Sequence, residues 1–182
     1  MDKDHDQTLV ERCRNGDDAA FTVLVTRYQR PIYNAAYRIL GNAEDASDIA
    51  QVVFLRVTER LADYDSQYKF FSWIYRIALN ESLNLLRRNG REEQLDDGID
   101  LPGLESADPE WQAYEAELSR RVQRALMGMG VDDRVVLTLR HFADLSYREI
   151  GIILGLEDKT VKSRLFEARQ RLRVLLADLR TA

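Results

Sequence analysis

The sequence is poor in cysteine and histidine, and this scarcity argues against several classes of protein. Cys13 is the only cysteine, so no internal disulfide can form and a reducing compartment is expected. The two histidines, His5 and His141, are far apart and offer no zinc cluster with a single cysteine. Neither a nucleophile–base set nor a phosphate-binding loop is present, so an enzyme is the least expected class. We expect neither a metal nor a cofactor.

Long hydrophobic runs are also absent. No window approaches the roughly 18 uninterrupted apolar residues that a membrane-spanning helix needs. The N-terminal segment, MDKDHDQTLVERC, is acidic and lacks the apolar run of a signal peptide. The sequence therefore predicts a cytoplasmic protein without membrane insertion. Its three prolines and nine glycines are few beside the many Leu, Ala, Arg and Glu residues, and this balance favours an all-α fold.

The net charge of −5 argues at first against nucleic-acid binding, but it averages three different blocks. Residues 1–91 carry 13 basic and 13 acidic side chains, whereas residues 92–118 carry 10 acidic and no basic ones. Residues 119–182 carry 13 basic and 8 acidic side chains, which is a net charge of +5. The overall charge therefore hides a basic C-terminal block.

Helical periodicity predicts an N-terminal helical domain over residues 1–91. Asp17 or Asp18 is expected to cap its second helix, and Pro31 is expected to break or kink that helix midway. Gly41 with the following asparagine separates the second helix from the third. The expected helices cover about 7–15, 19–40, 43–64 and 69–88.

The rest of the chain predicts a linker and a second small helical domain. Gly, Pro and Asp accumulate over residues 92–108, and periodicity disappears, so this segment is interpreted as an acidic flexible linker. Helices resume in the C-terminal domain, residues 109–182, with Asp108 as N-cap and Pro109 at the first helical position. They are expected over about 109–128, 132–142, 146–154 and 158–178.

The segment SYREIGIILGLEDKTVKSRLFEARQRL, residues 146–172, has the pattern of a helix-turn-helix. Ser146 caps a short helix, Gly155-Leu156-Glu157 forms the turn, and Asp158 or Thr160 opens a longer helix. In such a motif the early residues of the second helix meet base edges in the major groove, while flanking cations contact phosphates. The candidates are Arg148, Lys159, Thr160, Lys162, Ser163, Arg164, Phe166, Arg169 and Arg171. The alternative is a plain helical hairpin with a solvated basic face.

Aromatic residues concentrate in YDSQYKFFSWIY, residues 64–75, which holds six of the 16 in the chain. On a helical wheel Phe70 and Phe71 fall on the core side, whereas another stripe combines a tryptophan with cations and amides. This stripe suits a strand of nucleic acid, because rings stack on bases and Lys or Arg follows the phosphates. With two tyrosines of the preceding turn, the candidates are Tyr64, Tyr68, Lys69, Trp73, Arg76, Asn80, Asn84 and Arg87. Alternatively, Trp73 packs against a neighbouring helix.

Four segments in order resemble the signatures of a bacterial extracytoplasmic-function sigma factor of the sigma-70 family. They are GDDAAFTVLVTRYQRPIY, DASDIAQVVFLRV, FFSWIYRIALNESLNLLRR and SYREIGIILGLEDKTVKSRLFEARQRL. The resemblance spans nearly the whole chain, with only the linker unaligned, and it is far more specific than one helix-turn-helix. It implies a subunit that binds core RNA polymerase and directs promoter-specific transcription initiation, in a stress or signal response.

The resemblance also implies a partner for each segment. The helix with Asp45, Asp48, Gln51 and Phe54 would bind the clamp of the largest core subunit, and the aromatic segment would melt and read the −10 element. The C-terminal domain would read the −35 element and contact the flap of the second-largest subunit. The acidic linker would run toward the active-site cleft. Because most relatives are held by an anti-sigma factor, such a partner is expected here too.

One departure from the family pattern concerns the clamp-binding helix. Relatives commonly have Asp-Ala-Glu-Asp followed by Gln-Glu, but here Ser47 and Val52 replace the two glutamates. A Ser/Thr protein kinase that phosphorylates Ser47 would restore the negative charge. The alternative is tolerated sequence drift, because Glu44, Asp45 and Asp48 remain.

A second departure concerns the recognition helix. Glu167 stands beside Phe166, where relatives usually carry an arginine. A carboxylate repels phosphates but can accept a hydrogen bond from cytosine N4. We therefore expect Glu167 to belong to the −35 contacts and the preferred −35 sequence to differ from the family's commonest one.

Two other functions compete with a sigma factor. A conventional helix-turn-helix regulator would bind DNA without joining the polymerase, and the acidic linker and the aromatic stripe argue against it. A helical adaptor that mimics a sigma factor to sequester a partner would not need both the groove helix and the base-stacking stripe. The sequence therefore favours promoter recognition as part of RNA polymerase.

Overall fold

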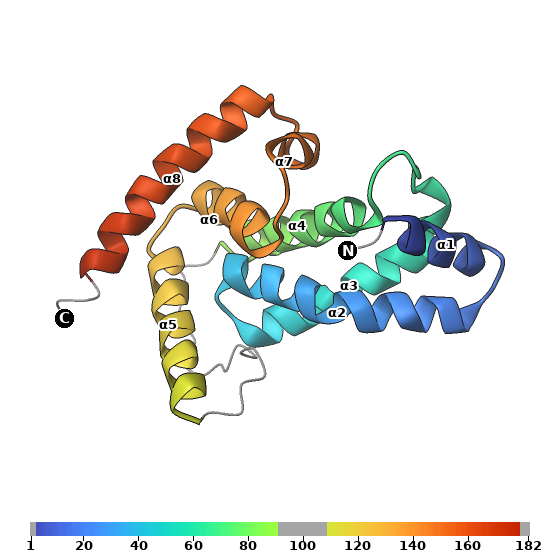
Figure 1. The fold of residues 1–182 in the computed structure, drawn as a ribbon, viewed down its shortest axis with the longest axis horizontal. Helices are drawn as coiled ribbons and strands as arrows, with labels where there is room; N and C mark the ends of the chain where they lie inside the picture. Colours follow the sequence, from blue (N-terminus) through green and yellow to red (C-terminus); the bar gives the residue numbers. More distant parts are fainter. Residues whose placement is uncertain (1–2, 91–108, 179–182) are drawn as a thin grey trace.

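The structure, a computed structural model, describes residues 3–90 and 109–178, and every regular element within these ranges is a helix (Figure 1). The N-terminal domain comprises α1 (Lys3–Arg14), α2 (Asp18–Leu40), α3 (Ala43–Arg60), the 3-10 turn η1 (Leu61–Asp63) and α4 (Phe70–Asn89). The C-terminal domain comprises α5 (Pro109–Met127), α6 (Val131–Leu137), the π-helical segment η2 (Thr138–Phe142), α7 (Tyr147–Leu154) and α8 (Asp158–Asp178). The predicted all-α fold is confirmed. The predicted linker, residues 92–108, lies outside the described residues.

Local signals set most helix ends. The Asp17 side chain accepts a hydrogen bond from the backbone N–H of Ala20 at the start of α2, and Asn42 caps α3 in the same way. Gly41 and Gly90 follow α2 and α4 in the left-handed region, with φ of 73° and 52°. None of the described helices is long and apolar enough to span a membrane.

Pro31 lies inside α2 and does not break it, although the sequence predicts a break or a kink. Proline has no backbone N–H to donate to the carbonyl of Arg27, so one helical hydrogen bond is missing there. Tyr28 and Ile32, on either side of this point, are fully buried. Packing of their side chains in the core therefore carries the helix past the missing bond.

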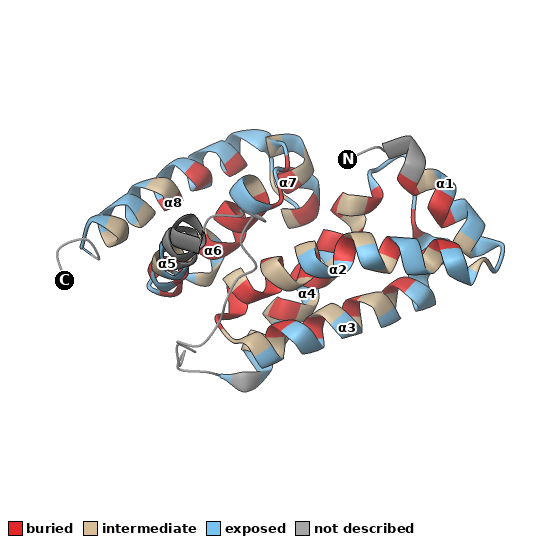
Figure 2. Cartoon of the chain, turned by 60° about the horizontal axis from the view of Figure 1, so that its bottom comes forward, coloured by how far each residue is buried: buried red, intermediate tan, exposed pale blue. Residues whose placement is uncertain are grey.

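Each domain has its own buried side chains, and the two cores meet. In the N-terminal domain they come from α2, α3 and α4, whose buried sides face one another (Figure 2). The largest fully buried side chains of the C-terminal domain are Leu126, Arg134, Leu137, Leu139, Ile150 and Leu165. Apart from Arg134, these residues belong to one continuous cluster with the core of the N-terminal domain. The domains are therefore packed together.

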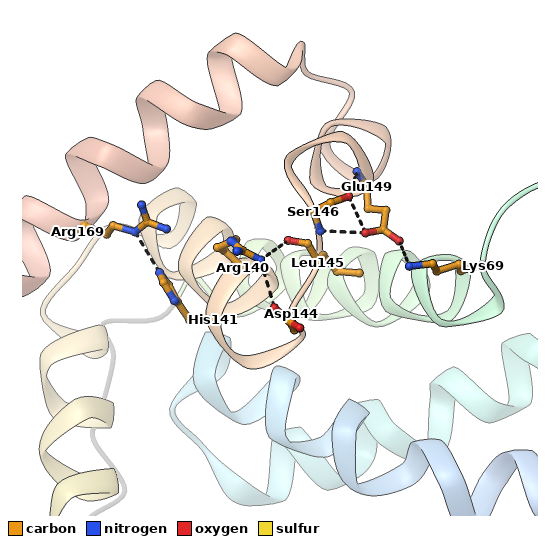
Figure 3. A network of polar contacts seen from close by, with 8 residues as sticks. All are labelled: Lys69, Arg140, His141, Asp144, Leu145, Ser146, Glu149 and Arg169. Atoms are coloured by element: carbon orange, nitrogen blue, oxygen red, sulfur yellow. Dashed lines mark hydrogen bonds and ion pairs between the residues drawn. The ribbon is translucent and has the colours of Figure 1, made fainter. Parts of the chain in front are cut away.

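Two regions of contact join the domains. α7 lies beside the N-terminal end of α4, and α5 and η2 lie beside the C-terminal end of α2 (Figures 1 and 3). The outer side of α8 and the surface shared by α2 and α3 lie away from this junction. The junction therefore brings together segments from opposite ends of the chain.

Candidate nucleic-acid interface

The loop that leads into α4 is held by α1. The guanidinium of Arg14 donates hydrogen bonds from Nη2 to the carbonyl oxygens of Leu61 (2.9 Å) and Tyr64 (2.6 Å). The side-chain amide of Gln7 donates to the carbonyl oxygen of Ser66. Because these bonds end on backbone oxygens, they define the path of the loop.

The aromatic side chains of this segment pack on one another. The ring of Tyr64 meets that of Phe70 edge-on, with centroids 5.5 Å apart, and also lies 5.5 Å from the ring of Trp73. The Tyr64 hydroxyl donates to the carbonyl oxygen of Tyr68 at 2.6 Å. Tyr64 is only 3% exposed, and burial raises the pKa of its hydroxyl. Its ring can reach a base only if the loop rearranges, whereas Tyr68 is 48% exposed.

The predicted stripe along α4 lies on the outside of the protein. Its polar members Lys69, Arg76, Asn80, Asn84 and Arg87 are exposed. Trp73 is half-buried, with its ring centroid 5.6 Å from that of Phe70, and it also borders a cavity of about 400 Å³. Trp73 therefore packs against the ring of Phe70 on its own helix and that of Tyr64 in the preceding loop, and it also borders open space. Its contact with a base stays a prediction.

A groove of about 620 Å³ lies between α2 and α3, where the sequence predicts polymerase binding. Ser47, Gln51 and Phe54 line it, together with Leu55, which is 63% exposed. The other wall comes from α2 and includes Phe21, Val25, Gln29, Arg30 and Tyr33. Asp48 is exposed on α3, and Asp45 is half-buried there. Asp45 and Asp48 are not among the residues that line the groove, whose apolar side chains and polar edge fit an amphipathic helical partner.

α7 and α8 form the predicted helix-turn-helix. Ser146 and Glu149 make a reciprocal capping box, because Ser146 Oγ accepts from the N–H of Glu149 and Glu149 Oε2 accepts from the N–H of Ser146. Gly155 ends α7 with φ of 66°. A Cβ on Gly151 would lie 2.6 Å from the carbonyl oxygen of Leu156. The turn therefore requires glycine at residue 151, and the turn sets the direction of α8.

The outer side of α8 presents most of the predicted DNA contacts to solvent. The exposed residues are Arg148 on α7 and Lys159, Thr160, Lys162, Ser163, Arg164, Phe166, Glu167 and Arg171 on α8. Phe166 is 63% exposed. Within the described ranges, the side chains of Lys159, Lys162 and Arg164 have no ion-pair partner. These three cations are free to contact phosphates.

Arg171 is already engaged inside the domain. Its Nη1 lies 2.6 Å from both carboxylate oxygens of Asp133 on α6, and its Nη2 lies 3.0 Å from Glu167 Oε2. The hydrogen bonds and charges of these two acids raise the pKa of Arg171. Arg171 thus braces α8 against α6, and a phosphate would have to compete with Asp133 for it.

Arg169 is half-buried and contacts the side chain of His141. Its Nε donates to Nε2 of His141 at 3.1 Å (Figure 3). Burial and the charges of Arg169 and Arg140 lower the pKa of His141, so its ring is neutral at pH 7 and can accept this bond.

Sequence analysis missed three residues of these surfaces: Arg14, Leu55 and His141. Arg14 acts through backbone carbonyls far along the chain, and no sequence pattern marks such a contact. His141 likewise meets Arg169 only through the packing of η2 on α8. Leu55 did carry a signal, because it lies at the edge of the apolar side of its helix.

Comparison with known proteins finds a family for each domain. Residues 24–92 match Sigma-70 region 2, and residues 119–172 match Sigma-70, region 4. The ECF RNA polymerase sigma factor SigW of Bacillus subtilis is 34% identical over 179 residues, which cover 93% of this chain and 96% of that protein. The RNA polymerase sigma-H factor of Pseudomonas aeruginosa is 33% identical over 181 residues, which cover 93% of each.

Solved structures with a similar fold were also found. The structure of CnrH in complex with the cytosolic domain of CnrY matches with a TM-score of 0.75 and 27% identity, over 96% of this chain and 98% of that chain. The sigma factor RpoE of Bartonella quintana, in complex with the anti-sigma factor NepR, matches with a TM-score of 0.72. That match is 21% identical and covers 86% of this chain and 96% of that chain, so it concerns the fold alone.

Proposed function

Because the chain belongs to the extracytoplasmic-function sigma factors of the sigma-70 family, we propose a role in promoter recognition for each of its exposed faces. A sigma factor joins core RNA polymerase and directs transcription initiation at particular promoters, which separates it from a conventional regulator that binds DNA alone. One observation supports the assignment of a DNA element to each exposed face. The same chain presents a helix-turn-helix with free cations on α8 and an exposed stripe of cations and amides around Trp73 on α4.

The stripe on α4 binds the melted −10 strand. Its cations follow the phosphates and its amides meet base edges, as expected for Lys69, Arg76, Asn80, Asn84 and Arg87. Tyr68 and Trp73 stack on unpaired bases, and Tyr64 supports both residues from inside the aromatic cluster. Tyr64 itself joins the contact only after the loop opens.

The outer side of α8 reads the −35 element in the major groove. Phosphate contacts come from Arg148 and from Lys159, Lys162 and Arg164, which have no ion-pair partner within the described residues, with Arg169 and Arg171 at the margin. Base edges are met by Thr160, Ser163, Phe166 and Glu167. Because Glu167 accepts hydrogen bonds, we expect a cytosine under it, and Glu167→Arg should change the preferred −35 sequence. Unchanged preference would make Glu167 a surface residue only.

Core RNA polymerase is bound at two places. The groove between α2 and α3 receives the clamp of the largest subunit, with Phe54, Leu55 and Gln51 in its lining. Asp45 and Asp48, on the same helix α3, add acidic contacts beside it. The C-terminal domain contacts the flap of the second-largest subunit, and the acidic segment 92–108 runs toward the active-site cleft. The shape of the groove supports the clamp contact, and membership of the family supports all three assignments.

Phosphorylation of Ser47 would strengthen the clamp contact. Ser47 is exposed, lies in the second turn of α3 and lines the groove, so a kinase can reach it. A phosphate there adds about −1.5 to −2 charges near a helix N-terminus, where negative charge is stabilised. The test compares Ser47→Ala, Ser47→Glu and wild type in cells. If cells with Ser47→Ala and cells with the wild-type protein transcribed the target promoters equally, phosphorylation of Ser47 would not be needed for function.

The protein acts in the cytoplasm, where RNA polymerase works, during a stress or signal response. An anti-sigma factor is the expected inhibitor, as for most members of the family. Co-purification from unstressed cells should recover this partner, and release under the inducing condition should follow.

The decisive experiment mixes the purified protein with core RNA polymerase and a promoter-containing DNA library, and sequences the transcripts. Discrete start sites that core enzyme alone does not produce would support the function and deliver the −10 and −35 elements together. Failure to bind core, with DNA binding by the free protein, would favour the conventional regulator instead.

A further inference from the structure

A cavity of about 300 Å³ lies where η2 meets the second half of α2, and the proposed function does not use it (Figure 1). Its lining includes Arg30, Asn34 and Arg38 of α2, Tyr75 of α4 and Phe142 of η2. Two of these side chains are cationic, and the described residues that line the cavity include no carboxylate. The wall of the cavity is therefore cationic.

The guanidinium of Arg38 is charged and buried in this wall. Its Nε and Nη1 have no hydrogen-bond partner among the described residues. Its Cζ lies 3.6 Å from the centroid of the Phe142 ring, but the face of a ring supplies no acceptor oxygen. Burial lowers the pKa of Arg38 to about 10, so the group stays charged at neutral pH. Because a buried charge without a counter-ion is costly, an anion that reaches Arg38 would stabilise the protein.

Asn34 lies one turn before Arg38 on the same side of α2 and has the opposite need. Its Oδ1 is buried and receives no hydrogen bond from the described residues. A guanidinium only donates hydrogen bonds, whereas this amide oxygen only accepts them. Water alone would satisfy these hydrogen bonds but would leave the charge of Arg38 without a counter-ion. The cavity therefore suits an anion that also carries a hydrogen-bond donor.

The rest of the wall is fixed by contacts that involve neither Arg38 nor Asn34. The Tyr75 hydroxyl donates to the carbonyl oxygen of Pro31 at 3.1 Å and so joins α4 to α2. Tyr75 is only 3% exposed, and its ring centroid lies 4.4 Å from that of Phe71. A ligand would thus meet a preformed wall, which lowers the entropy cost of binding.

Inorganic phosphate meets both needs of the cavity. Its unprotonated oxygens accept charge-assisted hydrogen bonds from guanidinium groups. As the hydrogen phosphate dianion it also keeps one P–O–H group, which can donate to Asn34. Sulfate has the same shape and charge but no proton to donate, and a carboxylate only accepts hydrogen bonds. The chemistry of the wall therefore favours phosphate over both of these anions.

We propose that the cavity between α2 and η2 binds inorganic phosphate, with Arg38 donating to its oxygens and Asn34 accepting from its hydroxyl. Arg30 adds a second positive charge at the edge of the site. The cavity shares no residue with the stripe of α4 or the outer side of α8 that are proposed to contact DNA. The inference therefore does not depend on the proposed function.

Binding is tested by isothermal titration calorimetry and thermal unfolding of the free chain with sodium phosphate at constant ionic strength. Phosphate should bind at one site and raise the melting temperature, because it binds the folded chain. At about pH 8, where both ions are dianions, sulfate should bind about threefold to tenfold more weakly, the effect of one hydrogen bond. Absence of phosphate binding, or equal affinity for the two ions, would overturn the proposal.

The role of Arg38 is tested with a variant matched in charge. Arg38→Gln should weaken phosphate binding at least about tenfold, because it removes the buried charge and its donors. Arg60→Gln is the control, since Arg60 is exposed at the end of α3 and does not line the cavity. It should leave the affinity unchanged. Equal weakening by both variants would mean that phosphate responds only to the net charge of the protein, and it would refute the site.

A second variant keeps the proposal testable even if Arg38→Gln fails to fold. Asn34→Asp is nearly isosteric and brings a carboxylate into the cavity, one turn from Arg38. It should raise the melting temperature without phosphate, because Arg38 gains a counter-ion, and weaken phosphate binding at least about tenfold through repulsion. Asn34→Ala removes only the acceptor and should lower the affinity for phosphate to that for sulfate. Phosphate binding by Asn34→Asp as tight as by wild type would place the anion elsewhere and overturn the proposal.

Discussion

The two regions that we propose to contact DNA hold their aromatic side chains in opposite ways. In the N-terminal domain Tyr64, Phe70 and Trp73 pack on one another, and Tyr64 is almost completely buried. In the C-terminal domain Phe166 projects from α8 with 63% of its surface exposed. The major groove is present in duplex DNA before the protein binds, so the side chains that contact it can be exposed in the free protein. Unpaired bases appear only after melting, so rings that stack on them can stay packed until then.

The sharpest test of this contrast is to truncate one ring from each region. Phe70→Ala should lower the free energy of unfolding by about 3–5 kcal/mol, because a fully buried ring leaves a cavity. Phe166→Ala should change it by less than about 0.5 kcal/mol, yet weaken −35 binding. Urea unfolding and duplex binding measure the two effects. Equal losses of stability would mean that the regions do not differ in this way.

The next largest effect is a loss of stability from changing the turn between α7 and α8, because this turn sets the direction of α8. Gly151→Ala should destabilise the C-terminal domain by about 1–3 kcal/mol, because its Cβ would meet the carbonyl oxygen of Leu156 at 2.6 Å. Gly128→Ala is the matched control, since its Cβ would make only ordinary contacts, at 3.5 Å with the carbonyl oxygen of Ala125 and at 3.6 Å with the side chain of Leu175. Thermal unfolding compares the two variants, and similar melting temperatures would contradict the close approach.

A smaller effect is expected on the salt dependence of DNA binding, and it should differ between the cations of α8. Arg164→Ala should reduce the salt dependence of −35 binding by about one phosphate contact and weaken affinity at low salt, because Arg164 has no ion-pair partner within the described residues. Arg171→Ala should change the salt dependence less, because Arg171 is paired with Asp133. Fluorescence anisotropy over a range of salt concentrations measures both slopes. A larger change for Arg171 would mean that the pair opens on DNA.

The smallest expected effect is a pH dependence of the C-terminal domain. The pKa of His141 is lowered in the folded protein, first by burial and then by Arg169 and Arg140. The unfolded chain therefore takes up this proton first as the pH falls below about 6.5, and stability declines until the folded pKa is passed. His141→Gln should flatten that part of the stability curve. An unchanged curve would show that another group titrates there.

Most helix limits were predictable because their signals are local. The pattern of Ser146 followed by Glu149 three residues later became the capping box of α7, and Gly41 ended α2. Of the break or kink predicted at Pro31, the break does not occur, because the burial of Tyr28 and Ile32 depends on other helices. The helix predicted over 132–142 likewise continues from α6 into the π-helical η2, a change that no local signal announced.

The residues of the candidate site could be predicted where they repeat with helical periodicity along one helix. They could not be predicted where segments far apart in the sequence come into contact. The exposed stripe of α4 and the outer side of α8 followed from the helical repeat alone. The pairing of Lys69 with Glu149 joins residues 80 positions apart, and that of Arg171 with Asp133 joins residues 38 apart. Such contacts depend on how the helices dock, and the sequence pattern of neither partner contains that information.

The hydrogen bonds from Arg14 to the carbonyl oxygens of Leu61 and Tyr64 make the backbone path of the loop before α4 independent of the side chains that the loop carries. Every residue type offers the same carbonyl, so exposed side chains of this loop can be exchanged without releasing its backbone. Under the proposed −10 role of the loop, changes at exposed loop residues such as Tyr68 should alter promoter preference, while Arg14 of α1 keeps the backbone in place. α1 thus allows the sequence of this loop to vary during evolution without loss of its backbone structure. Attempts to engineer promoter specificity should therefore begin with the side chains of this loop.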